Sequence, residues 1–288
     1  MEERLEQAEL DRLWLPGDPI ASAERLADAA ARPDRSELVR AELETQRARA
    51  LGLQGRTEEA EALLDSLEPA TGVLEVRVLL ERGRLRVGAG RPEEAAPLLE
   101  AALRAARRDG ETGLAIESAL ALAEADRSRT DQWIEEGLAD LVGTTDRRIL
   151  RWGAVLLDVR GWARFADGDA AAALVSFEDA VRYADRYGTP DQRFAAQWAV
   201  GRALRELGRT NEALALQSTL AAERPEEPAV AAELTELAEL AALAEPADTA
   251  ATGSTAATGS TAATDDEART ADDRTEHPVT GETHTIES

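Results

Sequence analysis

The chain has 288 residues, 3% of them aromatic, and a formal net charge of −24 at pH 7. Because the sequence contains no cysteine, disulfides, thiol catalysis and cysteine zinc sites are excluded, and the negative charge argues against nucleic acid or an anionic membrane surface as a partner. All 33 basic residues are arginine, which excludes a P-loop lysine, a Schiff base and a lysine general base.

From the first residue to about residue 245, a glycine recurs at a near-constant interval. Successive copies are 38, 35, 78 and 40 residues apart, and since 78 is twice 39, one copy between Gly90 and Gly168 is predicted to lack its glycine. The five glycines are Gly17, Gly55, Gly90, Gly168 and Gly208. A period of this length, made of two helical segments, predicts a solenoid.

Each glycine is expected to end one helix in a left-handed conformation, and Pro or Thr with acidic residues then begins the next, as in the segment 90–94, GRPEE. Small residues lie at fixed places on both sides of this turn and allow close helix packing. They are Ala48, Gly83, Gly161 and Gly201 before the turn and Ala60, Ala95, Ala173 and Ala213 after it. We therefore predict an all-α, right-handed superhelical solenoid of about six antiparallel helix pairs.

The pattern resembles the tetratricopeptide repeat over residues 1–245, and the stretch 197–223 is similar to bacterial tetratricopeptide proteins of unassigned function. The copy with the best match is Trp198, Gly201, Leu204, Gly208, Ala213 and Pro225. A second copy is Leu157, Gly161, Gly168, Ala173, Phe177 and Ala180. Gln217 replaces the expected aromatic residue, and the copy at residues 112–143 is recognisable mainly by its spacing. The resemblance implies a fold and no activity.

After Pro246 the helical period stops, and residues 249–264 repeat the hexad TAATGS. Such a segment buries too little apolar surface to offset its ordering entropy. We predict a repeat domain over residues 1–245, closed by a capping helix near residues 227–244, and a disordered acidic Thr/Ala-rich tail over residues 246–288. Both histidines, His277 and His284, fall in the tail.

In stacked helix pairs the first helix of each pair lines the concave surface, so its inward positions are the candidate binding site. Counting back from the turn glycines gives Arg49, Arg84, Trp162, Phe165, Trp198, Arg202 and Arg205. An arginine fork binds carboxylates, and tryptophan offers a flat apolar surface. The alternative interpretation is that these residues pack or form internal salt bridges. Trp14, Trp133 and Trp152 are expected to be core or cap residues.

No enzyme template fits, because the folded region lacks histidine and adjacent carboxylates on a helix point about 100° apart. We predict a non-catalytic cytoplasmic adaptor without cofactor or metal. Its partner is expected to be a protein or peptide with acidic groups or a C-terminal carboxylate. The alternative is a self-associating structural module that uses the exposed solenoid ends, and the oligomeric state is open between the two. No segment has the roughly 20 apolar residues of a membrane span, and the acidic start lacks signal-peptide features.

Overall fold

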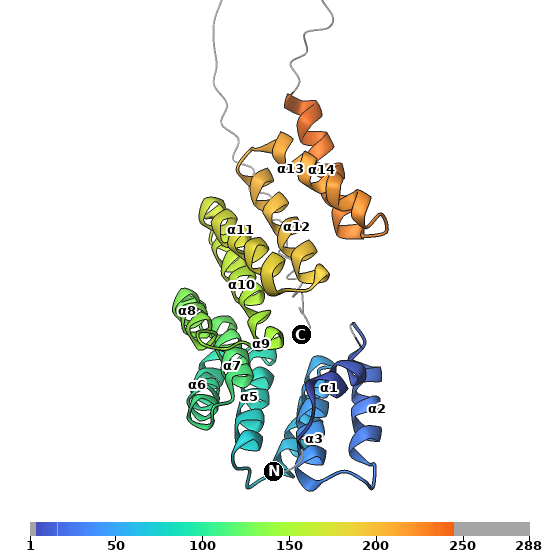
Figure 1. Ribbon diagram of the computed structural model, residues 1–288, viewed down its shortest axis with the longest axis vertical. Helices are drawn as coiled ribbons and strands as arrows, with labels where there is room; N and C mark the ends of the chain where they lie inside the picture. The colour runs from blue at the N-terminus through green and yellow to red at the C-terminus, as the bar shows by residue number, and fades with distance from the viewer. Residues whose placement is uncertain (1–3, 16, 245–288) are drawn as a thin grey trace, which may run out of the picture.

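The structure is a computed structural model that describes residues 4–15 and 17–244. Within these ranges the chain forms helices joined by short turns and has no strand, so the predicted all-α class is confirmed. The helices follow one another in pairs (Figure 1). The pairs are α1 (Gln7–Leu13) with α2 (Pro19–Ala30), α3 (Glu37–Leu53) with α4 (Thr57–Asp65), α5 (Val73–Gly88) with α6 (Pro92–Asp109), α7 (Thr112–Ala125) with α8 (Thr130–Asp140), α10 (Trp152–Ala166) with α11 (Ala170–Tyr187), and α12 (Pro190–Glu206) with α13 (Thr210–Glu223). The short α9 (Arg147–Leu150) precedes α10, and α14 (Pro228–Ala244) follows the last pair.

The pairs stack into an all-α solenoid. Most helices pack on the helix before and the helix after them, and the first helices of successive pairs also meet, α3 on α5, α5 on α7 and α10 on α12. In Figure 1 helices α1, α2 and α3 lie at the lower end of the stack, and α14 lies at the upper end. Because α14 packs on α12 as well as on α13, it takes the place of the first helix of a further pair.

The turn glycines have the predicted left-handed backbone. The φ angles of Gly17, Gly55, Gly90, Gly168 and Gly208 are 73°, 74°, 69°, 81° and 71°. At Gly90 the turn closes with two bonds, from the Gly90 amide to the Val87 carbonyl at 2.9 Å and from the Arg91 amide to the Arg86 carbonyl at 2.8 Å. Residues with a Cβ rarely adopt this conformation, which explains why glycine recurs at the turn.

The small residues ahead of the turn admit a large side chain from the second helix. A Cβ at Gly83 would collide with Leu99, one at Gly161 with Phe177, and one at Gly201 with Gln217. Leu99, Phe177 and Gln217 each lie nine residues after the turn glycine, and each is fully buried. Gln217 is accommodated there because its side-chain amide donates to the Trp198 carbonyl at 3.2 Å.

The pair α7 and α8 is the copy predicted to lack its glycine. A 3-10 turn over Arg127–Arg129 joins the two helices, and the Thr130 hydroxyl donates to the Ala123 carbonyl at 3.0 Å. The small residue is now on the second helix, where a Cβ at Gly137 would lie 2.8 Å from Leu156 of α10. Trp133 of α8 is buried, as expected of a core residue, and Trp14 and Trp152 are partly buried.

The predicted tail at residues 246–288, with His277 and His284, lies outside the described residues, as does the boundary at residue 245. None of the helices in the described ranges combines the length and the apolar character that a bilayer span requires.

Candidate functional site

The seven candidate residues all lie on first helices. Arg49 is on α3, Arg84 on α5, Trp162 and Phe165 on α10, and Trp198, Arg202 and Arg205 on α12. We call the surface formed by α3, α5, α7, α10 and α12 the inner face. The side-chain contacts divide the seven residues into a C-terminal group on α10 and α12 and an N-terminal group on α3 and α5.

The C-terminal group contains three aromatic rings, Trp162, Phe165 and Trp198, which we call the aromatic platform; Trp162 contacts each of the other two. The Trp162 ring centroid lies 5.5 Å from that of Phe165 and 5.8 Å from that of Trp198. All three side chains are partly buried, and Phe177 of α11 supports Trp162 from below with centroids 5.0 Å apart. The platform is thus fixed by the core and keeps part of its surface accessible.

Arg202 and Arg205 border the platform and are held by the last helix. The Arg202 guanidinium lies 5.4 Å from the Trp198 ring centroid, and its Nε lies 3.3 Å from a carboxylate oxygen of Glu233 on α14. Arg205 Nε donates to the other Glu233 oxygen at 2.6 Å, and Arg205 also pairs with Glu236. The Glu233 side chain is 2% exposed. Burial raises the pKa of Glu233 above its ordinary value, although both guanidinium groups act in the opposite direction.

A buried acid, Asp158 of α10, interacts with Trp162 of the platform. Burial raises the pKa of Asp158 to about 7, and the hydrogen bond from the Trp162 indole opposes this only in part. The Asp158 Oδ1 atom makes no hydrogen bond. The protonated form of this side chain is favoured because a buried carboxylate with few partners has lost its hydration.

In the N-terminal group, Arg84 belongs to a row of alternating charges across three helices, which we call the charge ladder: Glu42 of α3, Arg77, Glu81 and Arg84 of α5, and Glu117 of α7. Arg77 Nε lies 3.4 Å from Glu42. The two ends of the Arg84 guanidinium donate to Glu81 at 2.6 Å and to Glu117 at 2.9 Å. Since the Glu42 and Glu81 side chains are 0% and 2% exposed, these pairs are part of the packed interface between helices.

The pKa of Glu117 depends on arginines of two neighbouring helices. Burial on its own would raise the pKa of Glu117, but the charges of Arg84 and Arg49 outweigh it and hold the pKa below its ordinary value. Arg49 itself stacks on an aromatic ring, with its guanidinium 5.3 Å from the Trp14 ring centroid.

One rule connects the two groups. Arg49 and Arg202 both lie six residues before their turn glycines, and each covers an aromatic residue three residues before the turn of the preceding pair: Arg49 covers Trp14, and Arg202 lies 6.0 Å from the Phe165 centroid. Arg84 has Gly52 at the corresponding place, and it pairs with carboxylates instead. The recurrence of arginine at this position is therefore accounted for by contacts between neighbouring pairs.

Sequence reasoning missed the acidic half of these contacts. The repeat pattern does not single out Glu42, Glu81, Glu117, Glu233 or Asp158. A signal was present for one of them, because Glu81 precedes Arg84 by three residues, a spacing that brings two side chains together on a helix.

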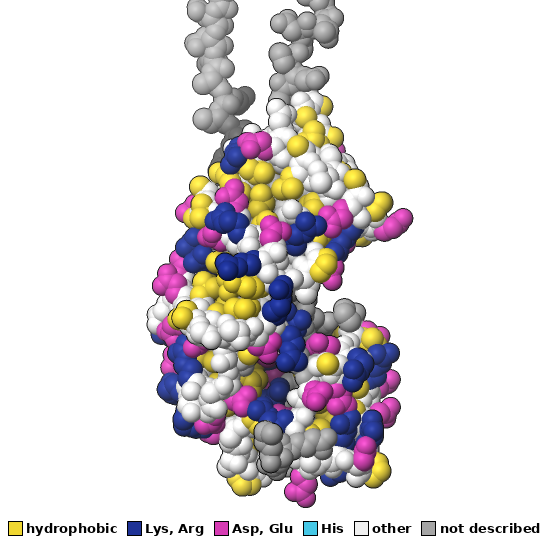
Figure 2. Space-filling view, viewed as in Figure 1, with side chains coloured by type: hydrophobic (Ala, Val, Ile, Leu, Met, Phe, Trp, Pro, Cys, Tyr) yellow, Lys and Arg dark blue, Asp and Glu magenta, His cyan; other side chains and the backbone are white. Residues whose placement is uncertain are grey.

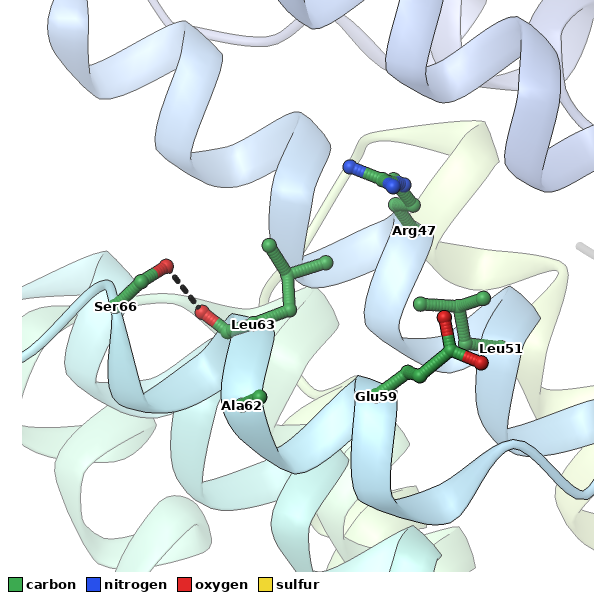
Figure 3. A pocket seen from close by; sticks show the side chains of 6 residues that line it. All are labelled: Arg47, Leu51, Glu59, Ala62, Leu63 and Ser66. Carbon is green, nitrogen blue, oxygen red and sulfur yellow. Dashed lines mark hydrogen bonds between the residues drawn. The ribbon is translucent and has the colours of Figure 1, made fainter.

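A separate hollow of about 340 Å³ lies between α3 and α4 (Figure 3). It is lined by Arg47, Leu51, Glu59, Ala62, Leu63 and Ser66, and none of the seven candidate residues lines it. At its edge the Ser66 hydroxyl donates to the Leu63 carbonyl at 2.6 Å. In the part of the chain that the structure describes, no three His, Cys, Asp or Glu side chains are grouped as metal ligands would be.

The fold resembles that of BtubC. The crystal structure of BtubC (BKLC) from P. vanneervenii matches 87% of this chain and 99% of its own chain with a TM-score of 0.52 and 17% sequence identity. At this identity the likeness shows the all-helical solenoid alone. No protein-family model and no curated protein matches the sequence.

Proposed function

We propose that the protein is a non-catalytic interaction scaffold, built from helix pairs of the tetratricopeptide kind and working in the cytoplasm, that holds a peptide or a segment of a partner protein on its inner face. The observation that carries this proposal is the aromatic platform. Its central ring, Trp162, contacts Phe165, Trp198 and the buried Phe177, and the three platform rings are partly accessible on first helices. Pre-organised aromatic surface of this kind is typical of the centre of a protein interface.

The shape of the surface supports the same proposal. In Figure 2 the molecule is hollowed between the part that contains α1 to α3 and the part that contains α12 to α14, and dark blue arginine side chains border the hollow. The candidate arginines already have partners within the chain, so a bound segment would replace those partners or bind beside them.

A selection from a displayed peptide library on the purified full chain tests the proposal. We expect enriched peptides whose affinity for the protein falls in Phe165→Ala, because this change removes one ring of the platform. The matched control is Val175→Ala on α11, where the side chain is 53% exposed and lies on a second helix. If no peptide is enriched, or if enriched peptides bind wild type and Phe165→Ala equally, the scaffold proposal is wrong.

A self-associating module is the second candidate, and α14 is the observation that favours it. This last described helix occupies a first-helix position, and its Leu240 is 40% exposed. Light scattering over a range of concentrations separates the two functions, because self-association changes the mass with dilution. A constant monomer mass for wild type would remove this candidate.

A further inference from the structure

The chain contributes a segment of its own to the inner face. Ahead of α1 the backbone is extended, and the Leu5 amide donates to Glu42 of α3 at 2.8 Å. The Arg4 guanidinium reaches beyond α3 to Glu111, at the start of α7, and donates to its two oxygens at 2.6 and 3.3 Å. Arg4 also lies 3.5 Å from Glu42. Two consecutive residues thus bridge the first and third helices of this part of the inner face.

The contact point at Glu42 is built to accept a main-chain amide. The Glu42 side chain is fully buried, its Oε2 accepts from the Leu5 amide, and its Oε1 has no hydrogen bond, with Arg77 Nε at 3.4 Å. A buried carboxylate without partners carries a large desolvation cost, so the amide satisfies a group that belongs to the helices. The Leu5 side chain meanwhile packs against the core cluster of α2 and α3 that contains Leu26 and Leu43.

The second contact point is the Glu111 side chain, which makes no bond to its own helix. It precedes α7, and its carboxylate accepts no capping bond from that helix. The Arg4 and Glu111 side chains are 42% and 24% exposed. An exposed pair of this kind contributes at most about 1 kcal/mol, so a competing segment can replace it.

We propose that α3, α5 and α7 form an acceptor site for an extended segment in which an arginine is followed by an aliphatic residue. In the isolated chain Arg4 and Leu5 occupy this site. A partner segment of the same chemistry binds by displacing them. The arginine pairs with Glu111 and Glu42, the following amide donates to Glu42, and the aliphatic side chain enters the Leu5 position. The net charge of −24 favours the approach of a basic segment. This inference rests on the proposed function, because it names the partner chemistry for one part of the inner face.

Fluorescence anisotropy with a labelled hexapeptide, Ala-Ala-Arg-Leu-Ala-Gln, tests the site on the full chain. We expect Arg4→Glu to bind the peptide up to about fivefold more tightly than wild type, because the variant's own segment can no longer pair with Glu111. Adding Glu111→Gln to Arg4→Glu should reverse the gain. The matched control is Arg32→Ala, which removes an exposed arginine paired with Asp34 in the turn after α2 and should bind like wild type.

The inference is overturned if Arg4→Glu binds no more tightly than wild type, or if a peptide with glutamate in place of the arginine binds equally well. Hydrogen exchange gives a second measurement that needs no ligand: the Leu5 amide should be protected in wild type and exchange faster in Arg4→Glu. An unprotected Leu5 amide in wild type would also overturn it. If the hexapeptide fails while library peptides bind through the aromatic platform, the acceptor site is wrong and the scaffold function stands.

Discussion

The two ends of the inner face carry different chemistry. Six residues before the turn glycine stands Arg84 on α5, which joins Glu81 and Glu117 in the charge ladder. The same position on α10 is Trp162 of the aromatic platform, which has arginine at its border. The comparison teaches that the helix-pair register fixes where a side chain points, whereas the residue type chosen for each pair decides whether that place is ionic or apolar.

Removing the support of the aromatic platform should have the largest effect. We expect Phe177→Ala to lower the free energy of unfolding by about 3 to 5 kcal/mol, because the ring is fully buried between α10 and α11 and leaves a cavity. Urea denaturation followed by circular dichroism measures it. Val175→Ala, two residues away and exposed, should stay within about 0.5 kcal/mol of wild type. A loss in unfolding free energy below about 1 kcal/mol for Phe177→Ala would contradict the support of the platform by the core.

The buried acid makes the aromatic end sensitive to pH. Because the pKa of Asp158 is about 7 in the folded state against an ordinary 3.8, the folded state binds the proton more tightly, and its stability falls as the pH rises from about 4 to about 7. Asp158→Asn keeps an acceptor for the Trp162 indole and does not titrate. We expect the stability of the variant relative to wild type to rise by about 1.4 kcal/mol per pH unit within this window.

Denaturation of both proteins at several pH values between about 4 and about 8 measures this difference. Glu233 titrates equally in both proteins and cancels in the comparison. A difference that is constant with pH would show that Asp158 stays ionised in the folded protein.

Breaking the charge ladder should cost less. We expect Arg84→Ala to destabilise the fold by about 2 kcal/mol, because it leaves the buried Glu81 carboxylate without its partner. Adding Glu81→Gln to that variant should recover part of the loss, since the uncompensated charge is then removed. Arg56→Ala, which breaks an exposed pair with Glu59, is the control and should change stability by less than about 0.5 kcal/mol. If Arg84→Ala is as stable as wild type, Arg84 is available for recognition instead.

The smallest change in stability is expected at the turn glycine, a feature that both ends of the inner face share. Gly90 has a φ of 69°, whereas Gly88, two residues earlier, lies within α5 with open space around it. We expect Gly90→Ala to lose about 1 kcal/mol because the left-handed conformation disfavours a Cβ. Gly88→Ala should leave the melting temperature unchanged or raise it slightly. Equal melting temperatures for the two variants would contradict the role of the turn glycine.

The fold was predictable from the sequence because its determinants are local. A left-handed glycine, a small residue seven positions earlier and a large one nine positions later recur in register, and the structure brings Gly161 against Phe177 as that register requires. The copy without its glycine could be placed only by spacing. Its small residue is Gly137 on the second helix, and no other copy has a small residue there from which this could have been inferred.

The candidate site was predictable in position but not in partners. Glu117 lies 33 residues after Arg84, and choosing it among 57 acidic residues requires the angle between successive pairs, which the sequence alone does not supply. The stacking of arginine on the aromatic residue of the preceding pair, as in Trp14 with Arg49, could have been found by comparing neighbouring copies. Arg4 lies before the first repeat and has no equivalent position in the other copies, so the repeat pattern does not indicate its contacts.

The bond between Arg4 and Glu111 also sets an order of events during synthesis. Nearly all other contacts join neighbouring helices, but this one joins residues 107 apart. At a synthesis rate of about 5 to 20 residues per second, the partner of Arg4 leaves the ribosome roughly 5 to 20 seconds after Arg4 itself. During that interval α3 and α5 can already pair while the bridge to α7 is still missing, so the nascent chain presents an open form of this surface that the finished protein closes.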